Sequence, residues 1–468
     1  MLLSMSQAYA RLMAAPTTAR RPRSRDLRGI RQRGKSYQVR VFGGTDPLTG
    51  KDVYLTGSAQ TERDAIRLRD RLRTEVADSR SSRTAGTLGH LLTEWLDQHS
   101  GEKETVDDYR FLAESFIIPA LGNVRLTRLT QPGPSLVEKF YAELRRCRRR
   151  CNGKPFIEHR KGCPSATNPD YQCDKRCKPH VCKPLGGSTL RHIHVVLNGS
   201  LKSAVRWGWI GVNPLDMIPK PRAPKPQPNP PSAANAARII EKAWSTDAEW
   251  GTFVWLTMVT GARRGELVAL RFNSVELSCG ECDRPVGWQD DQCGRCGSEL
   301  AESRTAMLEL RRNYSARQKD EKDTKTHQVR RISLDVATAE ILVAQFRRYA
   351  DRVTRLGGTA REDAYIFSYA PDNSRPCSPD GLTHRYSKMT ALLGLDTHIH
   401  ELRHYSATEL LAAGVDLRTV AGRLGHAGGG VTTLRVYAAW VRSADEQAAA
   451  LLASRLTGGL PSFRPARG

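Results

Sequence analysis

Apolar residues recur at helical spacing over most of the chain. Five of them mark one amphipathic helix: Leu88, Leu91, Leu92, Trp95 and Leu96. The same periodicity predicts further helices at residues 62–77, 109–118, 135–150, 188–207, 234–244, 252–261, 335–355, 378–393 and 443–456. The patterns from residue 86 to residue 217 are all helical, which predicts a helical domain in this part of the chain.

A two-residue period marks a small sheet near the N-terminus. Residues 37–41 alternate between polar and apolar, and residues 53–55 form a second short strand after a turn rich in Gly, Asp and Pro. A third strand is expected near Arg28. Residues 26–80 are therefore predicted to form a three-stranded sheet followed by the helix at 62–77.

Two further strands are predicted in the C-terminal half. Residues 306–311 and 329–334 read as strands around a polar turn at 318–328. Helices surround them on both sides in the sequence, so residues 233–457 are predicted to form a mixed α+β domain. The whole chain is expected to be multidomain and mainly α, with small β-sheets.

Proline density marks the clearest domain boundary. Residues 219–231 contain seven prolines in thirteen positions, which favours an extended, semi-rigid strand of chain. A linker at 219–232 therefore separates the helical domain, residues 86–218, from the domain at 233–457. Residues 1–25 are expected to form a basic, disordered tail, and residues 458–468 a second tail.

The charge balance adds a prediction about partners. The chain has 73 Lys and Arg against 49 Asp and Glu, a formal net charge of +24. Such an excess favours a polyanionic partner, and DNA or RNA is the first candidate. A merely basic surface is the alternative. No run approaches the roughly 18–20 apolar residues that span a bilayer, so a cytoplasmic protein without a membrane partner is expected.

Four of the eleven cysteines form two Cys-x2-Cys pairs separated by ten residues. They are Cys279, Cys282, Cys293 and Cys296. In a cytosolic protein this spacing favours a structural zinc ion held by four thiolates, because glycines allow each pair to turn around a sulfur. Redox-active thiols or disulfides are the alternatives. The predicted zinc ribbon, residues 278–298, interrupts the mixed α+β domain.

A second group of cysteines lies in an irregular basic insert at residues 147–184. It contains Cys147, Cys151, Cys163, Cys173, Cys177 and Cys182, with His159 and His180. Over residues 139–183, thirteen Lys and Arg face four acids. A second zinc ion here is one interpretation, and a flexible basic loop with free thiols is the other. The gaps between the cysteines fit no single zinc pattern, so four ligands are not assigned.

Four short motifs in the C-terminal half carry the candidate chemistry. They are Thr260-Gly261-Ala262-Arg263-Arg264-Gly265-Glu266-Leu267, His400-Glu401-Leu402-Arg403-His404-Tyr405, Leu424-Gly425-His426 and Thr432-Thr433-Leu434-Arg435-Val436-Tyr437. His400 and Arg403 are three positions apart and share a helix face. Together these motifs resemble the signature boxes of the tyrosine recombinase (phage integrase) family.

This resemblance implies a catalytic set. Its members are Arg263, Lys325, His400, Arg403, His426 and Tyr437, with Glu266 in support. Tyr437 is the implied nucleophile, and the arginines and His426 would stabilise the phosphate during the reaction. Lys325, on the turn before the strand at 329–334, is the implied general acid; Lys322 and Lys319 are close alternatives. His400 would assist proton transfer at the tyrosine.

The resemblance also implies a function. The chain would be an integrase that cleaves and rejoins double-stranded DNA through a 3′-phosphotyrosyl link, without ATP or a catalytic metal, and so integrates or excises a mobile element. Residues 26–80 would bind arm sites and residues 86–218 core sites, in a homotetramer on DNA near the nucleoid. Accessory DNA-bending or directionality proteins are further candidate partners. A non-catalytic DNA-binding regulator and a type IB topoisomerase-like enzyme are the alternatives.

Overall fold

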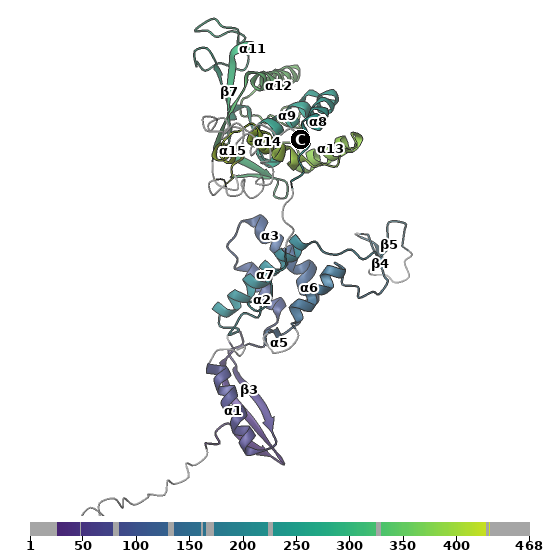
Figure 1. Cartoon of the computed structure of the whole chain (residues 1–468), viewed down its shortest axis with the longest axis vertical. Helices are drawn as coiled ribbons and strands as arrows, with labels where there is room; N and C mark the ends of the chain where they lie inside the picture. Colours follow the sequence, from purple (N-terminus) through teal and green to yellow (C-terminus); the bar gives the residue numbers. More distant parts are fainter. Residues whose placement is uncertain are drawn as a thin grey trace, which may run out of the picture. The chain divides into compact units, whose positions relative to one another are not determined.

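The computed structural model describes residues 26–46, 48–77, 84–129, 135–160, 162–164, 173–222, 228–323, 329–426 and 430. The chain divides into two compact units, Met1–Pro224 and Lys225–Gly468, and Figure 1 shows the elements of each. Within the described residues, no helix is both long and apolar enough to cross a membrane.

The first unit begins with an antiparallel sheet of three strands and one helix. The strands β1 (Ile30–Arg33), β2 (Ser36–Thr45) and β3 (Asp52–Ala59) lie in the order β1-β2-β3. Helix α1 (Glu62–Ala77) buries Ala65 and Leu72 against Val39 of the sheet. The predicted sheet and helix are confirmed, because alternation along β2 sends apolar side chains to one face.

A helical bundle follows. Its elements are α2 (Leu88–Asp97), α3 (Lys103–Leu112), the π-helical turn η1 (Ala113–Ile117), α4 (Ile118–Leu121), α5 (Leu126–Leu129), α6 (Leu136–Arg146) and α7 (Gly187–Arg206). Leu91, Phe140 and Leu197 are among its buried core residues. Helix α6 ends four residues earlier than predicted, because Cys147 is already extended.

The insert between α6 and α7 contains a two-residue antiparallel pair, β4 (Ile157–Glu158) and β5 (Lys178–Pro179). Its base is closed by backbone hydrogen bonds: Arg148 N donates to Lys183 O at 2.8 Å, and Leu185 N donates to Leu144 O at 2.9 Å. The insert therefore leaves and rejoins the bundle at neighbouring points.

The second unit surrounds a three-stranded antiparallel sheet with helices. Its sheet, ordered β10-β7-β6, consists of β6 (Val275–Cys279), β7 (Arg304–Leu310) and β10 (Arg330–Leu334). A separate pair, β8 (Arg312–Ser315) and β9 (Asp320–Asp323), follows β7. The predicted strands correspond to β7 and β10, whereas part of the predicted polar turn is the strand β9.

The helices of this unit carry most of the candidate residues. They are α8 (Ala233–Thr246), α9 (Ala248–Thr260), α10 (Arg264–Val268), the 3-10 turn η3 (Phe272–Ser274), α11 (Leu300–Ser303), α12 (Val336–Arg355), α13 (Pro379–Leu392), α14 (Ile399–Ala412) and α15 (Leu417–Leu424). One core joins Trp250, Leu308, Phe346 and Leu402, and so fixes α9, β7, α12 and α14 together.

Candidate active site

The junction between α9 and α10 positions Arg263. Helix α9 ends at Gly261, whose backbone is left-handed with φ +61°, and Arg263 is extended at the start of α10. A Cβ atom on Gly261 would lie 2.6 Å from Leu424 Cδ2, so a larger residue would push α15 away. Glycine therefore allows both the sharp turn and the close packing of α15.

Glu266 is the buried anchor of this junction, with 1% of its surface exposed. Its Oε2 accepts a hydrogen bond from Arg263 N at 2.7 Å, and its Oε1 accepts one from Arg263 Nη1 at 2.8 Å. Arg330 on β10 also donates to Oε2. Burial alone would raise the pKa of Glu266, but Arg330 and Arg263 lower it below its usual value. Glu266 is therefore ionised between two cations.

Arg403 of α14 is almost fully buried, with 3% of its surface exposed. Its Nη1 donates to Gly261 O. Its Nη2 donates to Leu424 O at 2.6 Å and lies 3.0 Å from His426 Nε2. Because a guanidinium can only donate, His426 Nε2 accepts, and the neutral ring carries its proton on Nδ1. Arg403 thus joins α9, α14 and the end of α15.

Arginines bind three consecutive carbonyls at the C-terminus of α15. Arg330 Nη1 donates to Arg423 O at 2.8 Å, Arg403 Nη2 to Leu424 O, and Arg263 Nη2 to Gly425 O at 3.2 Å. Carbonyls in the last turn of a helix have no partner within the helix and carry the negative end of its dipole. This helix end therefore gathers the three guanidinium groups.

Three histidines lie beside these arginines. His400 and His404 are one turn apart on α14, and their ring centroids are 4.9 Å apart in an edge-to-face arrangement. Loss of hydration, with smaller effects from nearby cations, lowers the pKa of His404 and His426 to about 4 each. Neighbouring atoms and then Arg403 also lower the pKa of His400, by less than full burial would, because this residue keeps an exposed side. All three rings are therefore neutral at pH 7, whereas the arginines remain charged.

The arrangement suits an anion at the surface. Arg263 keeps 27% of its side chain exposed, and His400 is exposed beside it, so the cationic cluster is open to solvent on this side. Guanidinium groups offer paired donors that match phosphate oxygens. The structure brings Arg263, Glu266, His400, Arg403 and His426 into this region. Lys325 and Tyr437 lie outside the described residues.

Arg330 and His404 are two residues that the sequence interpretation did not select. Arg330 shares its strand face with Ile332 and Leu334, both buried, and is itself 7% exposed. An arginine at an inward position of an alternating strand signals a buried ionic partner, because a charge without one is rarely tolerated there. His404 lies four positions after His400, on the same face of α14.

The four ribbon cysteines also come together. Cys279 Sγ lies 3.6 Å from Cys296 Sγ, and Cys282 Sγ lies 3.6 Å from Cys293 Sγ. Each Cys-x2-Cys pair is followed by a left-handed residue, Asp283 at φ +54° and Gly297 at φ +73°. A tetrahedral zinc ion with bonds of about 2.3 Å to sulfur separates its sulfurs by about 3.8 Å. The predicted four-cysteine group therefore has the geometry of a metal site.

The C-terminal part of the chain is similar to a known protein family. Residues 298–441 match the profile of the phage integrase family. The Tn1549 transposon integrase in complex with a circular intermediate DNA aligns with 78% of this chain and 99% of its own, at 13% identity and a TM-score of 0.51. The same integrase with transposon right end DNA covers 79% and 99%, at 15% identity and a TM-score of 0.50.

A lambda integrase dimer bound to a COC′ core site covers 88% of this chain and 95% of its own, at 16% identity and a TM-score of 0.43. No curated protein matches the sequence. At these identities the two Tn1549 integrase structures support the shared fold.

The buried carboxylate gives a prediction for stability. Glu266→Gln would leave Arg330 and Arg263 beside each other without a negative charge. Removing one partner of a buried ion pair typically costs on the order of 3 kcal/mol. We expect hydrogen exchange of α10 and β10 to accelerate accordingly. The matched control is Glu276→Gln, which breaks an exposed pair with Arg331 and should cost less than about 1 kcal/mol. Equal effects of the two changes would contradict the anchoring role of Glu266.

The histidines give a prediction for pH dependence. The pKa of His404 and of His426 is about 4 in the folded protein and near 6.5 in an unfolded chain, so the unfolded state binds more protons between these values. Stability of the second unit should therefore be full above pH 6.5 and decrease as the pH falls toward 4. His404→Gln should flatten this decrease in thermal unfolding measured at several pH values. An unchanged slope in that variant would contradict the assignment.

Proposed function

Because residues 298–441 belong to the phage integrase family, we propose that the chain is a site-specific DNA recombinase, an integrase of the tyrosine type. The observation that carries this proposal is the convergence of Arg263, Arg403 and His426 on one end of α15. Two fixed cations and a neutral imidazole at an open surface suit a phosphodiester, whose oxygens accept hydrogen bonds and carry charge.

The proposed chemistry is a transesterification. The Tyr437 phenolate oxygen attacks the scissile phosphorus, a bond from this oxygen to phosphorus forms, and the bond from phosphorus to the 5′ oxygen breaks. Lys325 protonates the departing 5′ oxygen, and His400 assists the transfer of the phenol proton away from Tyr437. Arg263 and Arg403 stabilise the charge on the non-bridging oxygens. Attack by a 5′ hydroxyl on the 3′-phosphotyrosyl link reverses these changes and rejoins DNA.

The packing supports this division of roles. Arg403 has its guanidinium held by Gly261 O and Leu424 O, and Arg263 has its own held by Glu266 and Gly425 O. Groups fixed before the substrate arrives need no reorganisation when charge develops. Bond exchange conserves the energy of the phosphodiester, so the proposed reaction proceeds without ATP or a catalytic metal.

We extend the proposal to the partners. Double-stranded DNA is the substrate, with core sites bound by residues 86–218 and arm sites by residues 26–80, in a homotetramer that acts in the cytoplasm at the nucleoid. The net charge of +24 supports a polyanionic partner. Exposed Arg31, Arg33 and Arg40 on β1 and β2 support the arm-binding role, since a basic sheet can lie in a groove of DNA. Accessory DNA-bending or directionality proteins would be further partners.

Covalent trapping tests the nucleophile. Wild-type protein incubated with a nicked duplex carrying the core site, taken from the ends of the host element, should form a DNA adduct that resists denaturation. Tyr437→Phe should form none, because the attacking oxygen is absent. The matched control is Tyr405→Phe, which removes a phenol on α14 and should keep the adduct.

The outcomes separate the alternatives. Binding of the duplex without an adduct in wild type would favour a non-catalytic regulator. An adduct with relaxation of any supercoiled DNA, but no exchange between two sites, would favour a topoisomerase-like enzyme. Arg403→Lys should slow adduct formation about 100- to 1,000-fold, as expected for the loss of one preorganised donor.

We also propose that the ribbon cysteines bind one structural zinc ion. The support is the approach of four sulfurs to a tetrahedral spacing and the burial of Cys279 and Cys293 beside Leu300. Four thiolates leave no open position, so this ion would stabilise the ribbon and take no part in catalysis.

Elemental analysis tests the ribbon site. Cys293→Ser should lower the zinc content of the full-length protein by one ion per chain and increase proteolysis between β6 and α11. Cys377→Ser is the matched control, because Cys377 is buried and belongs to none of the four-ligand groups. Zinc content unchanged by Cys293→Ser would rule out the ribbon as a zinc site.

A further inference from the structure

The insert between α6 and α7 holds eight cysteine and histidine residues in two spatial groups. The outer group consists of Cys147, Cys151, His180 and Cys182; the inner group consists of His159, Cys163, Cys173 and Cys177. In each group the four candidate ligand atoms lie within 4.8 Å of one another. We call the first group outer because two of its residues precede all four residues of the inner group in the sequence and the other two follow them.

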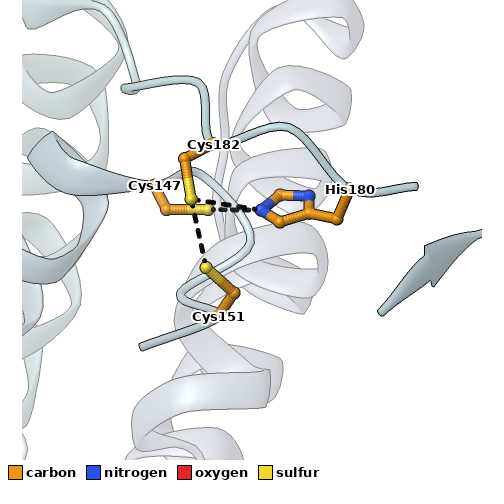
Figure 2. A group of neighbouring side chains, drawn as sticks. All are labelled: Cys147, Cys151, His180 and Cys182. Carbon is orange, nitrogen blue, oxygen red and sulfur yellow. Dashed lines mark hydrogen bonds between the residues drawn. The ribbon is translucent and has the colours of Figure 1, made fainter. Parts of the chain in front are cut away.

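The outer group converges on one point. Figure 2 shows the three sulfurs and the His180 ring turned toward one another. His180 Nε2 lies 3.2 Å from Cys147 Sγ and 3.6 Å from Cys182 Sγ, and Cys151 Sγ lies 3.3 Å from Cys182 Sγ. A disulfide requires about 2.05 Å between sulfurs, whereas ligands around a tetrahedral zinc ion lie about 3.5–3.8 Å apart. The spacing is that of metal ligands.

His180 is held in the orientation that a metal ligand requires. Its Nδ1 lies 2.7 Å from Glu158 Oε1 on β4, and the Phe156 ring stacks on it with centroids 4.4 Å apart. A carboxylate at Nδ1 places the ring proton there and leaves the Nε2 lone pair directed at the sulfurs. Carboxylate–histidine–metal arrangements of this kind orient the ring and increase the basicity of the ligand.

The inner group has similar spacing. Cys163 Sγ lies 3.6 Å from Cys177 Sγ and 4.0 Å from Cys173 Sγ, and Cys173 Sγ lies 3.2 Å from His159 Nδ1. Arg160 N donates to Cys177 Sγ at 3.5 Å, which helps to fix the position of this sulfur. Asp174 accepts hydrogen bonds from Arg160 and Arg176, which fixes the chain next to Cys173.

Among the described residues of the insert, little apolar packing holds the chain together. Its described strands are two residues long, and its large apolar side chains, Phe156, Ile157 and Val181, are 39%, 48% and 67% exposed. So short a segment buries too little apolar surface to offset the entropy of ordering the chain. Bound metal ions supply the missing free energy in such small modules.

We propose that the insert is a two-zinc module, in which the outer group and the inner group each bind one zinc ion through three cysteines and one histidine. Both sites are closed, since four protein ligands leave no position for water or substrate, so their role is structural. With the proposed ribbon site, ten of the eleven cysteines would be zinc ligands, and the remaining one is Cys377.

Zinc stoichiometry of the full-length protein is the first test. Native mass spectrometry of protein produced with zinc should show two ions per chain that depend on the insert. Cys147→Ser and Cys163→Ser should each remove one ion, and the double variant two. Cys377→Ser should remove none, and Cys293→Ser should remove only the ribbon ion. The helical core does not include the insert, so these variants should keep their helical circular dichroism.

Two results for the zinc content would contradict the proposal. A zinc content that is the same in wild type and in the double variant would overturn the proposal, even if the ribbon ion is present. Loss of both ions from either single variant would contradict two independently filled sites. Failure of the recombinase proposal would leave these metal counts unaffected, because they do not depend on activity.

Glu158 allows a second test, because its hydrogen bond to His180 should affect the zinc affinity of the outer group only if His180 is a metal ligand. Glu158→Gln keeps the size of the side chain but weakens the hydrogen bond to His180 Nδ1. Loss of such a partner typically weakens metal affinity about 10- to 100-fold, which competition with a chelator measures for the outer ion alone. Glu143→Gln is the control on α6, outside both groups. An unchanged affinity in Glu158→Gln would contradict the assigned orientation of His180.

Discussion

The candidate active site depends on the C-terminus of α15. Three consecutive carbonyls, those of Arg423, Leu424 and Gly425, each accept a hydrogen bond from a different arginine. These arginines come from β10, α14 and the start of α10, which are far apart in the sequence. Three like charges would repel one another if they were left alone, so the helix end and the buried carboxylate of Glu266 together make their approach possible.

Two glycines make this arrangement sterically possible. Gly425 ends α15 with φ +66°, and a Cβ atom there would lie 2.6 Å from Arg330. Gly261 plays the same part at the end of α9. The polar contacts of the site are therefore inseparable from backbone conformations that favour glycine, and the separate motifs of the sequence form one packed unit.

Much of this site was predictable, because Arg263, Glu266, His400, Arg403 and His426 stand in short motifs whose members lie close along the chain. Arg330 was not selected, since its partner Glu266 is 64 positions away and only the pairing of β10 with β7 turns it inward. Strand β9 was predicted as part of a polar turn, because its sequence, Asp-Glu-Lys-Asp, has no alternation of apolar and polar residues. Tyr437 and Lys325 remain predictions.

The cysteines of the insert show a different limit of sequence reasoning. Gaps between cysteines predict a group of neighbouring thiols when its members are close along the chain, as in the ribbon. In the insert, a complete inner group separates Cys151 from Cys182, and a histidine completes each group. When the fold of the insert brings together residues that are far apart in the sequence, the number of residues between them follows no recognisable pattern. The same limit applies to any nested pair of metal sites.

The base of the insert has a consequence for how the helical domain can vary. Hydrogen bonds between Arg148 and Lys183, and between Leu144 and Leu185, tie the two ends of the insert together where α6 ends and α7 approaches. The entropy of closing a loop grows only slowly with its length once the ends are fixed. Beyond this tie Arg150 still reaches Pro119 O of the bundle at 3.2 Å. The rest of the insert can therefore change in length and shape with little effect on the register of α6 and α7.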